Sequence, residues 1–173
     1  MADIHILFVG ESWKGSSARS MREALAALPH VYMDDLGEDS YFPKGRSLLV
    51  RGTNRLLGPW YRSELEHEMT TRLAVLRPDV LMIYKGSWLS AEAVRRAKRE
   101  GVLTVNVFPD YSPHAYGARL KRAMGEYDLI VSTKPFHPAS WGPVYGYTNR
   151  CVCVPHGFDP AVHYWKDPPG AQD

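Results

Sequence analysis

Short apolar segments alternate with amphipathic helical patterns over most of this sequence. Residues 4–9 are apolar except for His5, residues 80–84 and 102–108 form similar runs, and shorter ones occupy 30–33, 128–132 and 150–154. Strands of a parallel sheet are apolar along their whole length because helices cover both faces. We therefore expect a Rossmann-like, doubly wound α/β fold, with a mainly parallel sheet of about six strands and helices on both faces.

Helix signals fall between these expected strands. Met21, Leu25 and Leu28 have helical spacing, and similar patterns cover residues 61–76, 90–100 and 119–124. Residues 36–58 are instead rich in Gly, Pro, Arg and aromatic residues. We predict a long irregular loop there, and loops of that length are commonly functional.

The length fits one domain. The chain has 173 residues, 45% hydrophobic and 23% charged, as an ordinary globular domain does. Folding at this length buries about 70% of the surface that the unfolded chain exposes. We predict one Rossmann-like domain over residues 1–165, followed by a linker or disordered tail over 166–173. This length excludes a complete enzyme built from two such domains.

Charge and cysteine content narrow the classes of partner. The 21 basic and 19 acidic residues give a net charge of +2, without the concentrated basic stripe of nucleic-acid-binding proteins. The two cysteines, Cys151 and Cys153, have no second pair that would complete a zinc site, so we expect no metal. They are interpreted as buried structural thiols of a reducing compartment.

Neither a signal peptide nor a membrane span is indicated. The amino terminus lacks a basic region and its apolar run is short. Nothing approaches the roughly 20 apolar residues that a membrane helix needs. We expect a soluble, cytoplasmic protein.

Open parallel sheets bind ligands outside the carboxyl ends of their strands. After the first strand, this rule selects Gly10, Ser12, Lys14 and Gly15 as candidate substrate-binding residues. The segment is not a P-loop, because Ser16 stands where that motif requires lysine. A helix N-terminus there could receive an anion or a sugar hydroxyl; the alternative is that the glycines only permit a tight turn.

The next two edge loops supply further candidates. Lys85 could face a phosphate or an acceptor, and Trp88 could stack on a sugar ring or serve as a packing anchor. Asp110 and His114, four residues apart, are the catalytic candidates for base catalysis or hydroxyl recognition, with Tyr111 as a substrate-binding neighbour. Asp110 could instead cap the following turn. A hydrolase elbow of the G-x-S-x-G kind is absent from the sequence.

Several short motifs in order resemble the amino-terminal domain of GT-B glycosyltransferases. The ending V-P-x-G-x-D-P is similar to the close of that domain, and the most similar group is the CgeB-like (spore maturation protein) group. Three stretches carry that resemblance: R-P-D-V-L-x-x-Y-K-G at residues 77–86, G-V-x-T-V-N-x-x-P-D at 101–110 and H-G-F-D-P at 156–160. The resemblance covers essentially residues 4–165.

The resemblance implies the acceptor-side half of an enzyme that transfers a sugar from a nucleotide-activated donor. The donor-binding half would begin after residue 165, so the chain would need a donor-domain partner chain, or a homo-oligomer, to be active. Asp110 and His114 would line the acceptor side, and His156 and Asp159 would bind substrate near the interdomain cleft. The resemblance does not assign inverting or retaining chemistry. We expect no cofactor and, because the basic residues are dispersed, no nucleic-acid partner.

Two other functions remain open at this point. The same strand edge could belong to a non-catalytic nucleotide- or glycan-binding module. A flavodoxin-type signalling domain would need an acidic cluster at the end of the first strand, where Glu11 is the sole acid of the loop.

Overall fold

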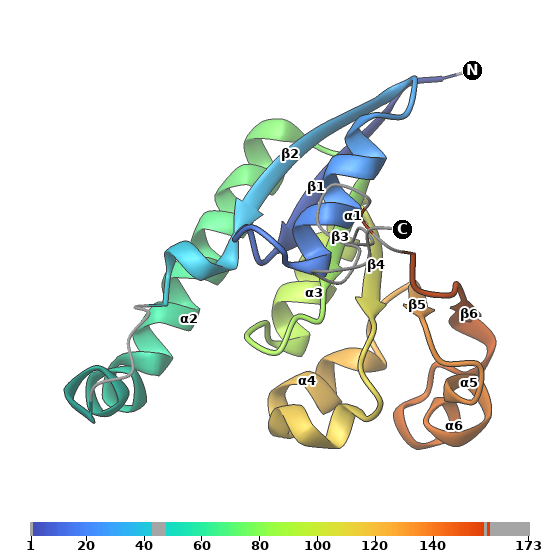
Figure 1. The fold of residues 1–173 in the computed structure, drawn as a ribbon. Helices are drawn as coiled ribbons and strands as arrows, with labels where there is room; N and C mark the ends of the chain where they lie inside the picture. Colours follow the sequence, from blue (N-terminus) through green and yellow to red (C-terminus); the bar gives the residue numbers. More distant parts are fainter. Residues whose placement is uncertain (1, 43–47, 158, 160–173) are drawn as a thin grey trace, which may run out of the picture.

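Six strands form one sheet in which every neighbouring pair is parallel (Figure 1). The structure is a computed structural model that describes residues 2–42, 48–157 and 159. The sheet order is β2-β1-β3-β4-β5-β6. The strands are β1 (Ile4–Gly10), β2 (Val31–Gly37), β3 (Val80–Tyr84), β4 (Leu103–Phe108), β5 (Leu129–Ser132) and β6 (Cys151–Cys153). The predicted Rossmann-like α/β class is confirmed.

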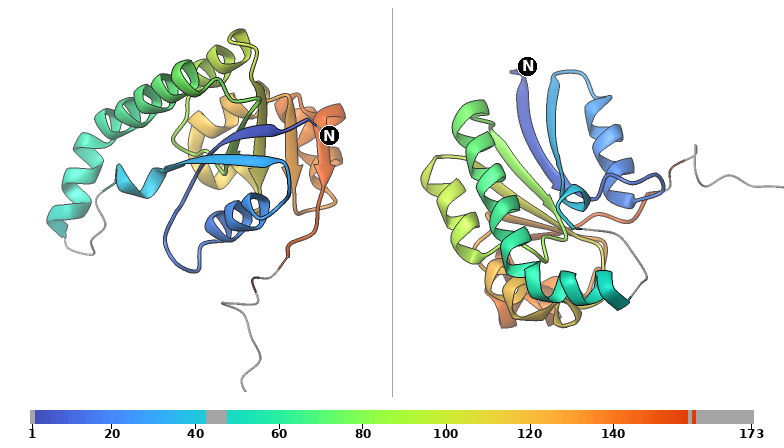
Figure 2. Two further views of the ribbon diagram at one scale, coloured as in Figure 1. Left: turned by 90° about the horizontal axis from the view of Figure 1, so that it is seen from above. Right: turned by 90° about the vertical axis from the view of Figure 1, so that its left-hand side faces the viewer.

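Helices cover both faces of the sheet, but unequally. Helix α1 (Ser17–Ala26) lies on one face, and α2 (Leu48–Leu76), α3 (Ala91–Arg99) and α4 (Gly117–Met124) lie on the other (Figure 2). The short helices α5 (His137–Ser140) and α6 (Gly142–Tyr145) follow beside α4. Single turns of 3-10 helix are η1 (Glu38–Ser40), η2 (Pro113–Tyr116) and η3 (Thr148–Arg150). Among the described helices, none is long and apolar enough to cross a membrane.

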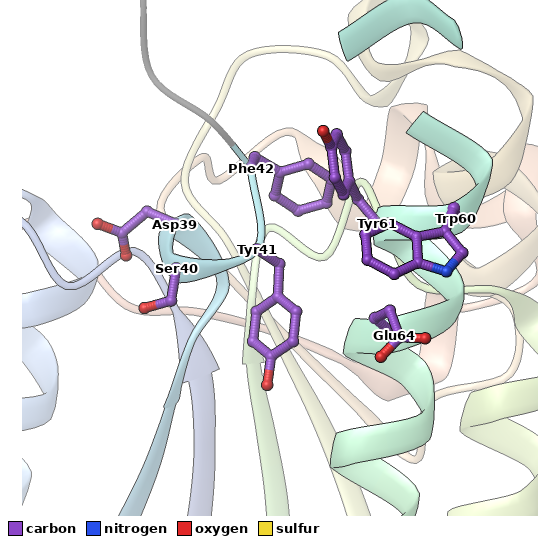
Figure 3. A pocket seen from close by; sticks show the side chains of 7 residues that line it. All are labelled: Asp39, Ser40, Tyr41, Phe42, Trp60, Tyr61 and Glu64. Atoms are coloured by element: carbon purple, nitrogen blue, oxygen red, sulfur yellow. The ribbon is translucent and has the colours of Figure 1, made fainter. Parts of the chain in front are cut away.

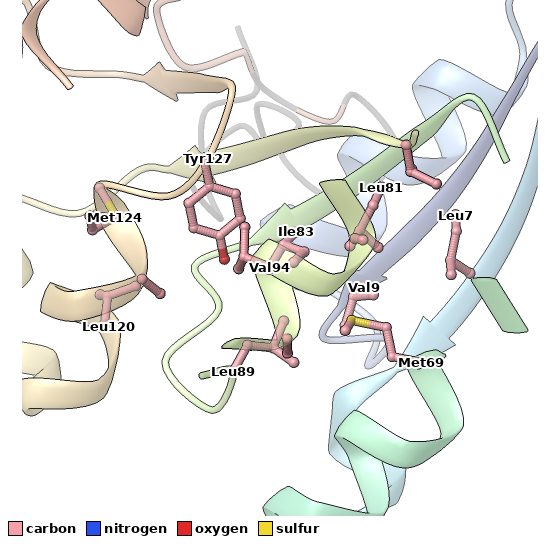
Figure 4. Close-up of a cluster of buried hydrophobic side chains, with 14 of the residues drawn as sticks. Leu7, Val9, Met69, Leu81, Ile83, Leu89, Val94, Leu120, Met124 and Tyr127 are labelled. Atoms are coloured by element: carbon pink, nitrogen blue, oxygen red, sulfur yellow. The ribbon is translucent and has the colours of Figure 1, made fainter. Parts of the chain in front are cut away.

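The main hydrophobic core lies between the sheet and helices α2 to α4. Leu7 and Val9 of β1 and Ile83 of β3 point into it, and Met69 of α2 packs over them (Figure 4). A smaller cluster on the other face joins Phe8 to α1. Burial on both faces explains why the central strands read as continuous apolar runs.

The predicted irregular loop at 36–58 is wrong for most of its described residues; residues 43–47, like the predicted tail at 166–173, lie outside the described residues. Strand β2 continues to Gly37, η1 follows, and α2 already begins at Leu48, with Pro59 inside it. Leu56 is 81% exposed, so this part of α2 lacks the buried apolar stripe that makes a helix visible in a sequence. Helices α5 and α6, too short for such a stripe, were not predicted.

The interpretation of both cysteines as buried is also wrong. Cys151 is half-buried and Cys153 is exposed, and both are free thiols. They lie on β6, an edge strand of three residues. Fewer neighbouring elements cover an edge strand, so its side chains are less buried than those of the central strands.

Candidate functional site

Strands β1 and β3 are neighbours whose following segments diverge. The chain passes from β1 into α1 on one face of the sheet and from β3 toward α3 on the other (Figure 2). In open parallel sheets a ligand-binding crevice commonly forms at such a switch point, and we call this part of the carboxyl edge the crevice. Four ionisable residues from different loops interact electrostatically around it: Glu11, Glu38, Lys85 and Asp110.

Asp110 has two partners at this edge. The Lys85 Nζ atom lies 3.8 Å from its Oδ2 atom, and the Tyr116 hydroxyl donates a hydrogen bond to that same oxygen. Burial, the bond to Asp110 and nearby acids raise the pKa of Tyr116, so this tyrosine stays a protonated donor. The following turn is capped by Ser112 and not by Asp110, the predicted alternative. The Ser112 hydroxyl accepts from the His114 amide at 3.2 Å.

Glu38 is a buried acid that the sequence reasoning missed. Only 6% of its surface is exposed. Burial raises the pKa of its carboxyl to about 8; Glu11 and Asp39 add to this shift and Lys85 opposes it. The one signal in the sequence was its place in the segment that follows the second expected strand, since ligands bind beyond the carboxyl ends of strands.

Lys85 reaches the site from a constrained backbone. Its φ angle is +63°, in the left-handed region that residues other than glycine seldom adopt. Its amide donates to the Val107 carbonyl at 2.8 Å, and the Asn106 side chain donates to the Lys85 carbonyl at 3.1 Å. These bonds from β4 hold the lysine at the crevice.

Trp88 uses one face of its ring for packing. Its ring stacks on Phe42, with centroids 3.9 Å apart and planes at 22°. The packing alternative for Trp88 therefore has direct structural support, since one face of the ring is taken.

The loop after β1 is a tight turn into α1. A Cβ atom on Gly10 would lie 2.9 Å from Phe8 and 3.1 Å from both Ala18 and Tyr84, so only glycine fits between strand and helix. Gly15 has a φ angle of +91°. The Ser16 hydroxyl caps α1 by accepting from the Ala18 amide at 3.2 Å. These contacts support the turn alternative for the two glycines.

The polar candidates of this loop have separate surroundings. The Ser12 amide donates to Asp39 Oδ1 at 2.8 Å, which joins the loop to η1. Lys14 is exposed. Beyond β6, His156 is exposed, and Asp159 accepts from the Ser20 hydroxyl at 2.8 Å, beside α1.

His114 and Asp110 have different partners, and no hydrogen bond or ion pair between them occurs in the described part of the chain. His114 lies 3.1 Å from the Tyr145 hydroxyl through Nε2, and its ring packs edge-on against Trp141. Tyr111 is 70% exposed, and its carbonyl oxygen lies 2.9 Å from His137 Nε2.

His137 is a second buried polar residue that sequence reasoning missed. Its Nδ1 atom lies 2.6 Å from the Ser132 hydroxyl, and burial lowers the pKa of the imidazole. A neutral ring with its proton on Nε2 donates to the Tyr111 carbonyl and accepts from Ser132. This residue fastens the 109–116 loop to the end of β5.

A cavity of about 520 Å³ lies beside the crevice, between the end of η1 and α2 (Figure 3). Its lining residues are Asp39, Ser40, Tyr41, Phe42, Trp60, Tyr61 and Glu64. Asp39 also accepts a hydrogen bond from the loop after β1, so the cavity adjoins the crevice.

A second hollow, of about 610 Å³, lies at the opposite edge of the sheet around the start of β3, and none of the predicted site residues lines it. Over the described ranges, no three His, Cys, Asp or Glu side chains are grouped as a metal site.

The fold is similar to that of a GT-B glycosyltransferase. Arabidopsis thaliana UGT89C1, solved in complex with UDP-L-rhamnose, superposes with a TM-score of 0.53 at 13% identity over 89% of this chain. The present chain spans 52% of that protein. A LacI-family transcriptional regulator from Brachyspira murdochii, described as an ABC transporter, gives a TM-score of 0.43 at 17% identity, over 82% of this chain and 37% of its own. No family model and no curated protein matches the sequence.

Proposed function

We propose that this chain is the acceptor-side domain of a nucleotide-sugar-dependent glycosyltransferase of the GT-B type, related to the CgeB-like group. The observation that carries the proposal is the cluster of Glu38, Lys85, Asp110 and Tyr116 at the switch point of a fold similar to a GT-B enzyme. Since the chain spans about half of that enzyme, a donor-binding domain would complete it. The free thiols support a cytoplasmic location.

Asp110 is suited to receive a proton from an acceptor hydroxyl. Tyr116 and Lys85 both engage its Oδ2 atom, so Oδ1 is available to a ligand. In the proposed step, the acceptor oxygen bonds to the anomeric carbon of the donor and its proton passes to Asp110. The bond from that carbon to the diphosphate breaks, and its electron pair leaves on the phosphate oxygen. Positioned acid–base groups typically contribute about 10²–10⁴-fold to such reactions.

The other candidates would bind substrate around this centre. Lys85 would contact the acceptor, and His114 would line the same side from its position against Trp141. The loop after β1 and His156 would face the donor-binding domain.

The test is sugar transfer with and without a donor-binding domain, taken from the coding sequence adjacent to this one. Nucleoside diphosphate release is measured for a panel of nucleotide sugars. The isolated chain should give none above the background rate, and the pair should transfer. Asp110→Asn should lower transfer by about 100-fold or more, whereas Glu23→Gln on α1 should leave it unchanged. Turnover by the isolated chain, or full activity of Asp110→Asn in the pair, would sink the proposal.

A non-catalytic nucleotide- or glycan-binding module is the second candidate. The observation in its favour is that Asp110 and His114 are engaged by different partners, so that the predicted acid–base pair is not assembled. Calorimetric titration separates the two functions: binding of a nucleotide or glycan without transfer, even with the donor-binding domain added, identifies the module.

A further inference from the structure

Four aromatic side chains line the cavity between η1 and α2. Tyr41 and Phe42 follow η1, and Trp60 and Tyr61 come from α2 (Figure 3). The Phe42 ring meets Tyr61 edge-on, with centroids 6.0 Å apart, and stacks on Trp88 behind it. Trp60 lies against Tyr61 at 5.5 Å. Because the rings support one another, the aromatic wall exists before any ligand binds.

The charge beside these rings is negative. Glu64 lies one helical turn after Trp60 and points to the same side of α2, facing Tyr41 (Figure 3). In the described residues, no hydrogen bond or ion pair is formed by the Glu64 carboxylate. Burial raises the pKa of the Tyr41 hydroxyl, and Glu68 and Glu64 raise it further. The cavity therefore combines aromatic faces with an available carboxylate.

The cation that acts most on Tyr41 is already paired. The lining contains neither lysine nor arginine. Arg72 is the cation that lowers the pKa of Tyr41. It donates to Glu68 Oε1 at 2.7 Å and to the Asp35 carbonyl at 2.7 Å. The second acid of the lining, Asp39, bonds the Ser12 amide and points away from the rings (Figure 3). Glu64 is thus the acid left for a ligand.

We propose that this cavity binds an organic ammonium group, the chemical class that aromatic faces and a carboxylate recognise together. Aromatic rings attract cations through the negative potential of their faces, most strongly in the case of tryptophan. Trp60 is 58% exposed at the rim, which gives a ligand access. The lining also offers a neutral sugar the hydroxyls of Ser40, Tyr41 and Tyr61 besides the two acids, but only a cation gains from both the charge of Glu64 and the negative potential of the ring faces. The proposal goes beyond the proposed function, because it requires no sugar transfer.

Choline and its uncharged isostere 3,3-dimethylbutan-1-ol provide the test. Each is titrated into the full chain while tryptophan indole N–H signals are followed by NMR, with Trp60→Phe used to assign the Trp60 signal. Choline should shift that signal and bind about tenfold more tightly than the isostere. High salt should weaken choline binding, since the Glu64 charge is screened.

Two variants and two controls sharpen the result. Glu64→Gln should weaken choline binding about fivefold and Trp60→Ala at least about tenfold. Glu23→Gln on α1 and Tyr32→Ala on β2, both outside the cavity, should leave it unchanged. Circular dichroism melting verifies that each variant is folded.

Three outcomes would overturn the proposal: equal binding of the isostere, tighter binding of methyl β-glucoside than of choline, or no shift at tens of millimolar choline. None of them depends on a donor-binding domain. Failure here is therefore distinguishable from failure of the glycosyltransferase proposal.

Discussion

At the scale of single residues, Glu38 shows how position determines chemistry. It comes from the turn after β2, yet its charged neighbours Glu11 and Lys85 come from the loops after β1 and β3. With 6% of its surface exposed, the carboxyl keeps its proton at neutral pH. A neutral carboxyl near Glu11 and Asp39 limits the negative charge that accumulates in the crevice.

The titration of Glu38 predicts a pH-dependent stability. Burial raises the pKa of its carboxyl from the ordinary 4.5 to about 8. An acid whose pKa is higher in the folded state stabilises the fold fully at low pH, and this contribution is lost as the pH rises from about 4.5 to about 8. The loss is on the order of 5 kcal/mol at most.

Urea unfolding at pH 5 and pH 8.5 measures this effect. Glu38→Gln cannot ionise, so its free energy of unfolding should change less between the two values than that of the unmodified protein. If the free energies of unfolding of both proteins changed equally with pH, Glu38 would not be the group that causes the change.

At the scale of elements, one glutamate connects three helices. Glu66 of α2 accepts from the Ser90 amide at 2.7 Å, from the Ser90 hydroxyl at 3.0 Å and from Arg119 of α4 at 2.7 Å. The Ser90 hydroxyl also caps α3 by accepting from the Ala93 amide at 3.2 Å. Glu66, inside α2, thus joins this helix to the amino-terminal ends of α3 and α4.

Loss of the α3 cap should be measurable. Ser90→Ala removes both the cap and the hydroxyl bond to Glu66, and we expect a loss of about 1–2 kcal/mol in the free energy of unfolding. Chemical denaturation provides the measurement. Ser63→Ala, at an exposed position within α2, is the matched control and should change stability little. Equal effects of both variants would show that the cap contributes nothing.

At the scale of the whole molecule, stability should fall from the middle of the sheet toward β6. Strands β1, β3 and β4 have neighbours on both sides, and most of their side chains are buried. Strand β6 has one neighbour and two exposed residues. Hydrogen exchange reports such differences residue by residue.

Amide exchange should therefore be slowest for β1, β3 and β4. We expect the amides of β6 to exchange at least about a hundredfold faster than the slowest amides of β1. The measurement is native-state hydrogen exchange followed by NMR. Uniform protection across all six strands would mean that the sheet opens only as a unit.

Much of this architecture could be predicted from the sequence because apolar runs mark buried strands. The residues at the carboxyl edge followed from the same rule. Long-range pairings could not be predicted: Phe42 stacks on Trp88, and Tyr145 contacts His114. No local pattern encodes such contacts, since they exist only after the sheet has placed distant loops together. Leu56 illustrates a second limit. A helix is recognised in a sequence by the regular spacing of its buried apolar residues, and an exposed leucine does not contribute to that spacing.

The position of β1 in the sheet has a consequence for synthesis on the ribosome. This strand pairs with β2 on one side, but its other partner is β3, where Ile6 is matched with Val80. The nascent chain therefore holds an apolar strand with one unsatisfied edge until some seventy further residues have emerged. An exposed strand of this kind is prone to aggregation. Translation speed across the α2 coding region should accordingly affect the yield of folded protein.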